Sequence, residues 1–281
     1  MKTFLAVVGD GSAASVLETA ILAARPFDGY IVGLNALTTE YAVVFGGEMG
    51  FSVSSEVDRT LEREGQERRE QARALFQSVM RQHNVPTDRA GGTGLAAEWR
   101  EETGRQNAIV GTLGRIFDLI VVERPAKLAS LAEATLEDAL FEGGTPVLMT
   151  PQTAPATMGE RILIAWNNST ETARTVAFAA PFLARAKSIE VLSVEGSLVP
   201  GPSAEEMAAM LKHKGLPVTW RHIAQRGRMT PGEVFLAECK NTGADLLVKG
   251  AYTQSRLRQM IFGGTTRHII MEAELPVILA H

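Results

Sequence analysis

Apolar runs and amphipathic segments alternate along the chain, and the second half shows this pattern most clearly. Uninterrupted apolar runs predict strands there, and apolar residues at helical spacing predict the helices between them. The expected strands are ILIAW (162–166), IEVLSV (189–194), PVTWRHI (217–223), DLLVK (245–249) and PVILA (276–280), and the expected helices are Thr172–Arg185, Ala204–His213 and Thr230–Asn241. We expect the first helix to face the sheet with one stripe, Ala173, Val176, Ala177, Ala180 and Leu183. This alternation predicts an α/β fold with a parallel sheet covered on both faces.

The first half repeats the order of the second. TFLAVVGDGS near the start matches RILIAWNNST from Arg161, and FDLIVV (117–122) matches ADLLVK (244–249). Each half ends in a strand led by proline, TPVLMTP in the first and LPVILAH in the second. A repeat of this length predicts two tandem units. The join TPQTAPATMGE (Thr150–Glu160) has no apolar period and is expected to be a linker, so the units should span about 1–150 and 158–281.

One insertion distinguishes the first half. Residues 38–55 are polar and rich in glycine, and a charged helix of about 28 residues is expected after them. The insertion has three open interpretations: a cover for the first pocket, a seat for a small ligand, or an assembly contact. Trp99 and Trp220 fall at matching strand positions, and we expect both to pack in the core.

A glycine-bearing stretch after the fourth strand of the second half is the strongest functional signal. Gly250 follows that strand directly, where ligands bind in open parallel sheets, and glycine lets backbone approach a ligand. Gly263 and Gly264 then precede a helical pattern, with Thr265 and Thr266 at its start. Free amides and the positive dipole end of a helix favour phosphate there, and threonine hydroxyls can add donors. The alternative is a tight turn before an ordinary capped helix.

The first half has no such stretch. Glu123 stands where Gly250 stands in the second half, and its carboxylate would repel phosphate. Gly143 and Gly144 follow a helix and are expected to end it. Any phosphate site is therefore expected in the second half.

Composition and charge exclude several classes of function. The net charge of -4 does not favour nucleic acid, and no apolar run reaches the length that spans a bilayer. Cys239 is the single cysteine and is expected to be buried. The five histidines show no metal-ligand spacing, and no nucleophile with a general base stands out. We expect a soluble cytoplasmic protein without catalytic or metal-ligating residues, at most a slow ATPase.

The repeat, the DLLVKG strand end and the glycine spacing resemble the universal stress protein family in its tandem two-domain form. The resemblance implies two repeats, each an open five-stranded parallel sheet flanked by helices of the adenine-nucleotide alpha-hydrolase-like type. It also implies a pseudo-dimer in which the final strands, 146–150 and 276–280, contact each other. Many members bind ATP through glycines placed after the fourth strand.

The resemblance implies a set of binding residues in the second half. The residues expected near the base and ribose are Ala165, Trp166, Asn167 and Val194, and those expected near the ribose and phosphates are Lys249, Gly250 and Thr253. The phosphate end is expected to contact Gly263, Gly264, Thr265 and Thr266, and the intervening segment adds Ser255 and Arg256. Three residues depart from the family pattern. Thr253 replaces the second glycine, Gly264 occupies the hydroxyl position, and Asn167 replaces an aspartate that Asp10 retains in the first half.

The resemblance therefore implies a stress-response protein that binds ATP, with or without magnesium, in its C-terminal repeat and acts as a regulatory or protective module. A homodimer and further protein partners stay open. The alternative is a scaffold of the same fold without nucleotide, which Thr253, Gly264 and Asn167 favour. A nucleotide-using enzyme is a third class, which would need catalytic groups that the sequence does not show.

Overall fold

The computed structural model describes residues 1–9, 13–37, 55–87, 93–127, 129–224, 227–251 and 264–281, without the side chains of 37 and 55–62. The insertion at 38–54 and the binding residues Thr253, Ser255, Arg256 and Gly263 lie outside the described residues. The predictions made for them stay predictions.

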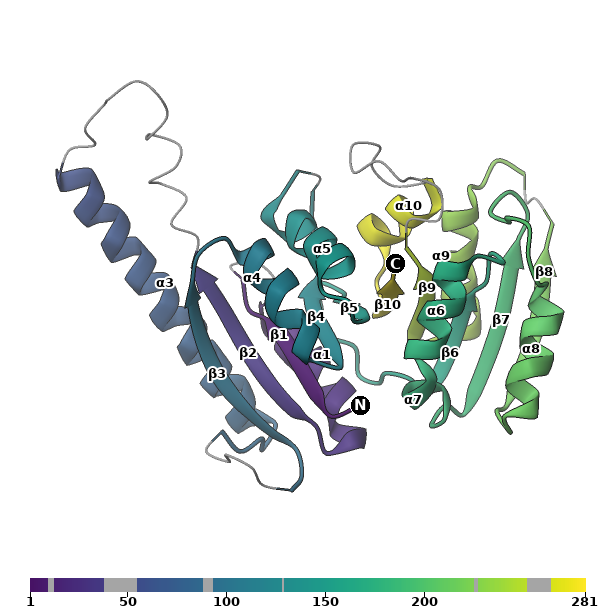
Figure 1. Cartoon of the computed structure of the whole chain (residues 1–281), viewed down its shortest axis with the longest axis horizontal. Coiled ribbons are helices and arrows are strands. Elements are labelled where there is room, and N and C mark those ends of the chain that lie inside the picture. The colour runs from purple at the N-terminus through teal and green to yellow at the C-terminus, as the bar shows by residue number, and fades with distance from the viewer. Residues whose placement is uncertain (10–12, 38–54, 88–92, 128, 225–226, 252–263) are drawn as a thin grey trace.

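One sheet of ten strands runs through the molecule (Figure 1). Its order is β3-β2-β1-β4-β5-β10-β9-β6-β7-β8, so both halves have the same strand order. The strands of the first half are β1 Thr3–Val7, β2 Tyr30–Leu37, β3 Ala96–Thr103, β4 Leu119–Glu123 and β5 Val147–Thr150. Those of the second half are β6 Arg161–Ala165, β7 Ser188–Val194, β8 Val218–Ile223, β9 Leu246–Gly250 and β10 Val277–Ala280.

The two five-stranded halves join through their last strands. Strands are parallel within each half, whereas β5 and β10 pair antiparallel, with Val277 opposite Met149 and Leu279 opposite Val147. The predicted fold, two repeats packed as a pseudo-dimer, is thus confirmed. Each last strand is buried at every residue, so the join belongs to the core.

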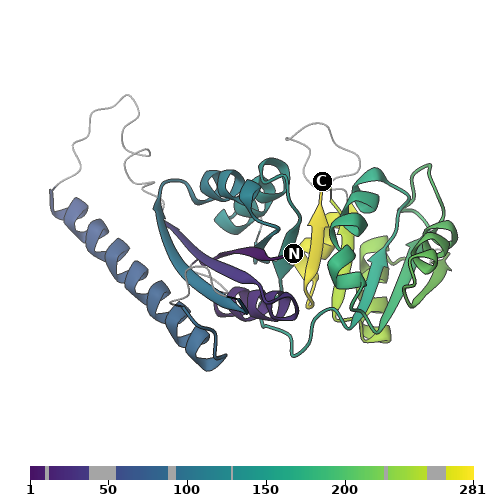
Figure 2. The same ribbon diagram turned by 60° about the horizontal axis from the view of Figure 1, so that its bottom comes forward.

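Helices cover both faces of the sheet (Figures 1 and 2). One face carries α1 Ala13–Ala24, α3 Ser55–Gln82, α6 Thr170–Phe178, α7 Ala180–Leu183 and α8 Ala204–His213. The other face carries α4 Gln106–Leu113, α5 Leu131–Glu142, α9 Pro231–Thr242 and α10 Gly264–Glu272. The short turns η1 Arg25–Phe27 and η2 Gly114–Ile116 complete the described elements. Each face buries one apolar cluster that continues from the first half into the second.

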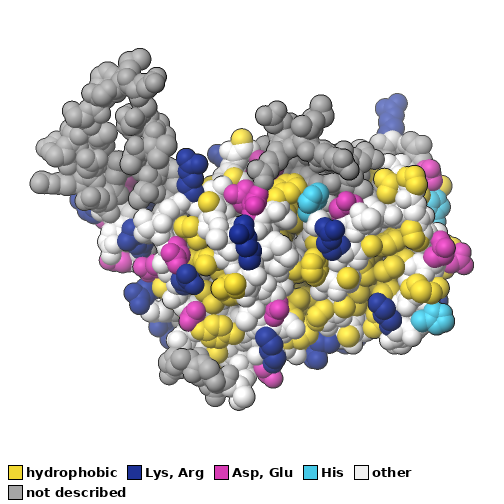
Figure 3. Space-filling view, in the orientation of Figure 1, with side chains coloured by type: hydrophobic (Ala, Val, Ile, Leu, Met, Phe, Trp, Pro, Cys, Tyr) yellow, Lys and Arg dark blue, Asp and Glu magenta, His cyan; other side chains and the backbone are white. Residues whose placement is uncertain are grey.

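The predicted buried stripe of the helix after β6 is wrong in part. Val176 and Leu183 are buried, but Ala173, Ala177 and Ala180 are exposed. The helix instead turns Thr172 and Thr175 toward the sheet, because their hydroxyls find acceptors in Asn167 and in the carbonyl of Glu171. Figure 3 shows apolar side chains gathered on this face of the second half.

The two tryptophans at matching strand positions differ in their surroundings. Trp99 is half-buried and packs against Phe76 of α3, with ring centroids 5.2 Å apart, so its predicted core position is confirmed in part. Trp220 is 40% exposed, so its predicted core position is wrong. The reason is the length of the covering helix, since α3 has 28 residues and α8 has 10. No helix among the described residues has the length and apolarity that crossing a membrane requires.

Candidate functional site: the carboxyl edge of β6 and β9

The carboxyl ends of β6 and β9 lie side by side in the sheet. Ile164 pairs with Val248, and from this point the chain continues to β7 on one side and to β10 on the other. Such a reversal of strand order is where open α/β sheets bind ligands. The structure brings the predicted residues Ala165, Lys249 and Gly250 to this edge, and Val194 ends the neighbouring strand β7. All four are buried.

Asn167 holds the turn between β6 and α6 together. Its side-chain oxygen accepts hydrogen bonds from Ser169 Oγ (2.8 Å) and Thr172 Oγ1 (2.5 Å). Ser169 Oγ in turn accepts a hydrogen bond from the Thr172 amide and so caps α6. Asn167 is 5% exposed, and its oxygen is directed at the protein's own helix rather than at open solvent.

A second loop closes over this turn. Trp166 Nε1 donates to the carbonyl of Pro202 at 2.8 Å, and the Val199 amide donates to the carbonyl of Asn167 at 3.1 Å. Asn168 Nδ2 donates to the carbonyl of Val199 at 3.0 Å. Trp166, at 3% exposure, therefore packs inside the protein with its indole N–H already bonded.

Gly250 makes a close approach to α6. A Cβ atom built on it would lie 2.4 Å from the Thr172 amide nitrogen and 2.7 Å from the Glu171 carbonyl carbon. The first turn of α6 therefore requires a residue without a side chain here. The sequence identified the need for a close backbone approach, but the described partner is a helix of the same chain.

Lys249 is a buried cation at the same edge. Its residue exposure is 3%, and Nζ donates to the carbonyl of Gly250 at 2.7 Å. Burial lowers the pKa of Lys249 to about 8, and the nearby carboxylate of Glu171 opposes that shift. Glu171 is a neighbour that sequence reasoning missed, because the predicted helix starts at Thr172 whereas α6 includes Glu171 in its first turn.

Helix α10 begins at Gly264, close to where the sequence predicts a helix N-terminus. Gly264 is exposed, and a Cβ built on it would have no heavy atom within 4 Å among those described. Thr265 is half-buried and Thr266 is 5% exposed. No described atom therefore crowds Gly264 in the first turn of the helix, where the sequence predicts a phosphate site.

The matching edge of the first half has different chemistry. Val122 occupies the strand position of Lys249, and Glu123 that of Gly250. A Cβ built on Gly9, beyond the end of β1, would lie 3.5 Å from Glu123 Oε1. The carboxylate therefore lies beside the place where a phosphate would have to sit.

Other reactive groups among the described residues have structural surroundings. Cys239 is 2% exposed, and burial raises the pKa of its thiol to about 12, so it is no nucleophile at neutral pH. Ser193 Oγ lies 2.9 Å from His222 Nδ1, and Glu195 lies 3.4 Å from His222 Nε2. Ser193 is 4% exposed within β7, so this chain of contacts links strands and does not present a nucleophile. No group of three metal-ligating side chains occurs in the described part of the chain.

Comparisons with known proteins agree with this architecture. Residues 158–281 match the universal stress protein family. A universal stress protein from Archaeoglobus fulgidus superposes with a TM-score of 0.66 at 15% identity, over 99% of this chain and 95% of that one. A protein from Pseudomonas aeruginosa assigned to the same family superposes with a TM-score of 0.57 at 18% identity, over 100% and 93%.

A further Pseudomonas aeruginosa protein, described as functionally unknown, has a TM-score of 0.56 at 16% identity, over 100% of this chain and 92% of that one. No curated protein matches the sequence. At these identities the solved structures support the fold. The sequence match carries the family assignment, and residues 158–281 are a domain of the universal stress protein family.

Proposed function

We propose that the second repeat binds an adenine nucleotide, ATP, at the carboxyl edge of β6 and β9, and that the protein acts as a regulatory or protective module. Membership of residues 158–281 in the universal stress protein family supports a role in the stress response. Occupancy of the site would act by favouring one conformation or one association state over another.

The buried cation Lys249 carries this proposal. An ammonium group at 3% exposure is costly unless an anion compensates it. Its hydrogen bond to the Gly250 carbonyl and the proximity of Glu171 compensate it in part. The phosphates of a nucleotide between Lys249 and the first turn of α10 would complete that compensation.

The residues present fit some parts of a nucleotide better than others. Lys249 and the first turn of α10 suit phosphates, and the apolar Val194 suits a base. Asn167 supplies no carboxylate to magnesium, and its oxygen already accepts two hydroxyl bonds. We therefore propose that magnesium, where present, is carried by the phosphates.

A scaffold without nucleotide is the second candidate, and one observation favours it. Trp166 and Asn167 make their hydrogen bonds to the loop at 199–202 and to α6, so the protein itself uses two of the groups assigned to the base and ribose. In this case the turn between β6 and α6 would serve folding and association only.

A binding titration of two variants separates the candidates. Lys249→Met removes the charge and keeps an apolar side chain of similar length, and Glu123→Gln is the matched control at the edge of the first repeat. The nucleotide proposal expects about tenfold or greater loss of ATP affinity for Lys249→Met and none for Glu123→Gln. Native mass spectrometry of gently purified protein should show co-purifying ATP. If millimolar ATP gives no thermal shift in the unmodified protein, the scaffold function holds instead.

A further inference from the structure

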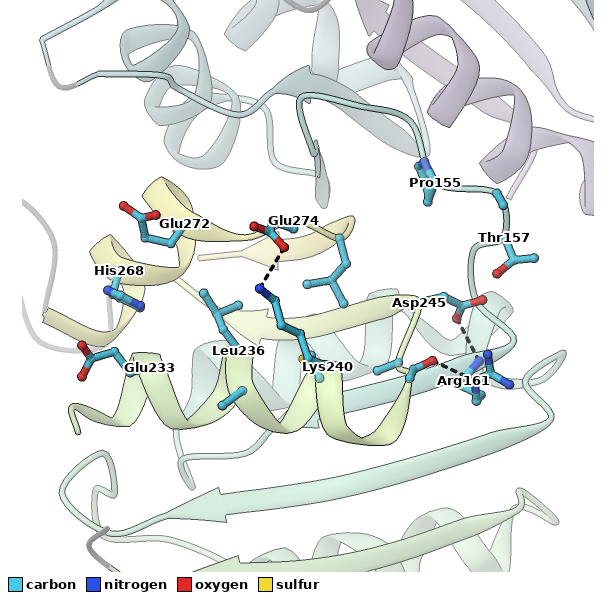
Figure 4. Close-up of a pocket in the computed structure, with 16 residues that line it drawn as sticks. Pro155, Thr157, Arg161, Glu233, Leu236, Lys240, Asp245, His268, Glu272 and Glu274 are labelled. Carbon is cyan, nitrogen blue, oxygen red and sulfur yellow. Dashed lines mark hydrogen bonds and ion pairs between the residues drawn. The ribbon is translucent and has the colours of Figure 1, made fainter. Parts of the chain in front are cut away.

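A second cavity lies away from the carboxyl edge, between α9, α10 and the linker (Figure 4). Its volume is about 670 Å³, within the range of small-molecule sites. The walls are α9 on one side, and α10 with the following turn on the other. Residues 155–157 of the linker lie across its far end.

The cavity exists because two helices touch at one end and separate toward the other. A Cβ built on Gly232 in α9 would lie 2.8 Å from His268 Cβ and 3.1 Å from the Thr265 carbonyl oxygen in α10. This contact joins the amino-terminal ends of both helices. Toward their carboxyl ends the walls are bridged by one exposed ion pair, Lys240 with Glu274 at 2.9 Å.

The equivalent helices of the first repeat touch near their carboxyl ends instead. A Cβ on Gly111 of α4 would lie 2.9 Å from Glu142 Cβ and 3.1 Å from the Asp138 carbonyl oxygen in α5. Asn107 Nδ2 also donates to Asp138 Oδ2 at 2.8 Å. The open wedge is therefore a property of the second pair of helices and does not follow from the fold.

Apolar side chains form the interior of the wedge. Leu236 and Cys239 of α9 are 9% and 2% exposed and line it together with Leu275. The linker adds Pro155 and Ala156. These groups offer a ligand apolar contact and few hydrogen bonds, so an apolar body is the part that they would hold.

Charge at the rim is negative. Lys240 pairs with Glu274, and Asp245 accepts the backbone amides of Glu160 and Arg161 while the Arg161 guanidinium donates to the Gly243 carbonyl. Glu272 has no ion pair or hydrogen bond to any described residue, and it ends α10.

At the narrow end the negative charge persists. Glu233 lies near His268 in Figure 4 and caps α9 through Thr230. Hydrogen bonds from Thr230 lower the pKa of Glu233, so this carboxylate is ionised at neutral pH. Carboxylates at both ends of an apolar interior define the chemistry of the complementary ligand.

We propose that this wedge binds an apolar molecule that carries an ammonium-type cation, with the apolar body against Leu236 and Leu275 and the cation beside Glu272. The Lys240–Glu274 ion pair opens when the ligand binds. Breaking it costs little free energy, because both side chains are exposed and solvent already screens their charges. The site is distinct from the carboxyl edge of β6 and β9, and it does not depend on nucleotide binding.

Matched small probes test the proposal on the full chain. n-Octylammonium, n-octanoate and ethylammonium are titrated by calorimetry, and amide shifts in α9 and α10 locate the site. The expected result is that octylammonium binds at least about tenfold more tightly than either other probe, since it alone has both the tail and the positive charge.

Three variants assign the binding to the wedge. Ala237→Phe fills the cavity from its half-buried wall and should abolish binding of octylammonium. Glu272→Gln should weaken it about fivefold, and Glu205→Gln, on the exposed side of α8, should not change it. Equal binding of octanoate, undiminished binding of ethylammonium, or no binding of octylammonium overturns the proposal.

Discussion

The carboxyl edges of the two repeats share strand order and differ in chemistry. In the first repeat the fourth strand ends in Val122 and Glu123, and the Glu123 carboxylate lies beside the end of β1. In the second repeat it ends in Lys249 and Gly250, a buried cation followed by a residue without a side chain. The strand pairing of both edges is otherwise equivalent.

This difference shows that the same strand order carries opposite charges at the two edges, a carboxylate in the first repeat and a buried cation in the second. The same contrast recurs on one face of the sheet, where α4 and α5 pack closely while α9 and α10 enclose a cavity. A duplicated architecture thus leaves room for each half to change its surface separately.

The largest effect on the free energy of unfolding is expected from a substitution at Gly250. Gly250→Ala should lower the free energy of unfolding by about 3 kcal/mol or more, because the new Cβ would meet the backbone of α6 at 2.4 Å and a helix start cannot shift easily. Gly264→Ala is the matched control, since a Cβ there meets no described atom within 4 Å. Urea unfolding of both variants measures the contrast. Equal costs at the two glycines would show that the approach of α6 is not tight.

Lys249 should make the stability of the protein depend on pH. Its pKa of about 8 in the folded protein lies below the ordinary value of 10.5, so the unfolded chain binds more protons between these pH values. The free energy of unfolding of the unmodified protein should therefore rise from pH 8 to pH 10.5, relative to Lys249→Met. The expected relative gain is about 2–3 kcal/mol.

The same residue links pH to ligand binding. A bound phosphate would favour charged Lys249, so ATP affinity should fall as the pH rises above about 8. Calorimetry in buffers of different ionisation enthalpy would measure proton uptake on binding. If the rise in the free energy of unfolding between pH 8 and pH 10.5 disappears in Glu123→Gln and persists in Lys249→Met, the titrating group lies in the first repeat and Lys249 is not responsible.

Much of the fold could be predicted because its signals are local. Strands such as 162–166 and 245–249 are apolar on both faces, and the proline before each last strand marks where it begins. The stripe of the helix after β6 could not be placed in the same way. Alanine is tolerated on either face of a helix, and only the internal hydrogen bonds of Thr172 and Thr175 settle which face is buried.

The candidate site was predictable in position and less so in detail. Strand ends locate Lys249 and Gly250, but the direction of the Asn167 side chain depends on hydroxyls at the start of α6. The cavity between α9 and α10 had no sequence signal, because it depends on the angle between helices more than 20 residues apart. Gly232, where these helices touch, is the one residue that could have indicated their crossing point.

A smaller effect is expected at the cap of α6. Ser169→Ala should lower the free energy of unfolding by about 1 kcal/mol, since it removes the acceptor for the Thr172 amide and a donor to Asn167. Thr170→Ala, an exposed neighbour, should have little effect. Thermal unfolding at one pH compares them. A loss of ATP affinity in Ser169→Ala larger than its loss of stability would show that the Asn167 turn contacts the nucleotide directly.

The smallest effect on stability is expected at the ion pair that bridges the walls of the cavity between α9 and α10. Lys240→Gln should leave the urea midpoint unchanged, because Lys240 and Glu274 are 68% and 72% exposed and span an open cavity. Arg115→Gln should lower it measurably, because the Arg115 guanidinium also donates to the Glu142 carbonyl at the end of α5, at 3.0 Å. A measurable loss in Lys240→Gln would mean that the pair holds the walls together. In that event the Lys240–Glu274 ion pair would hold α9 and α10 together as strongly as packing holds α4 and α5 together.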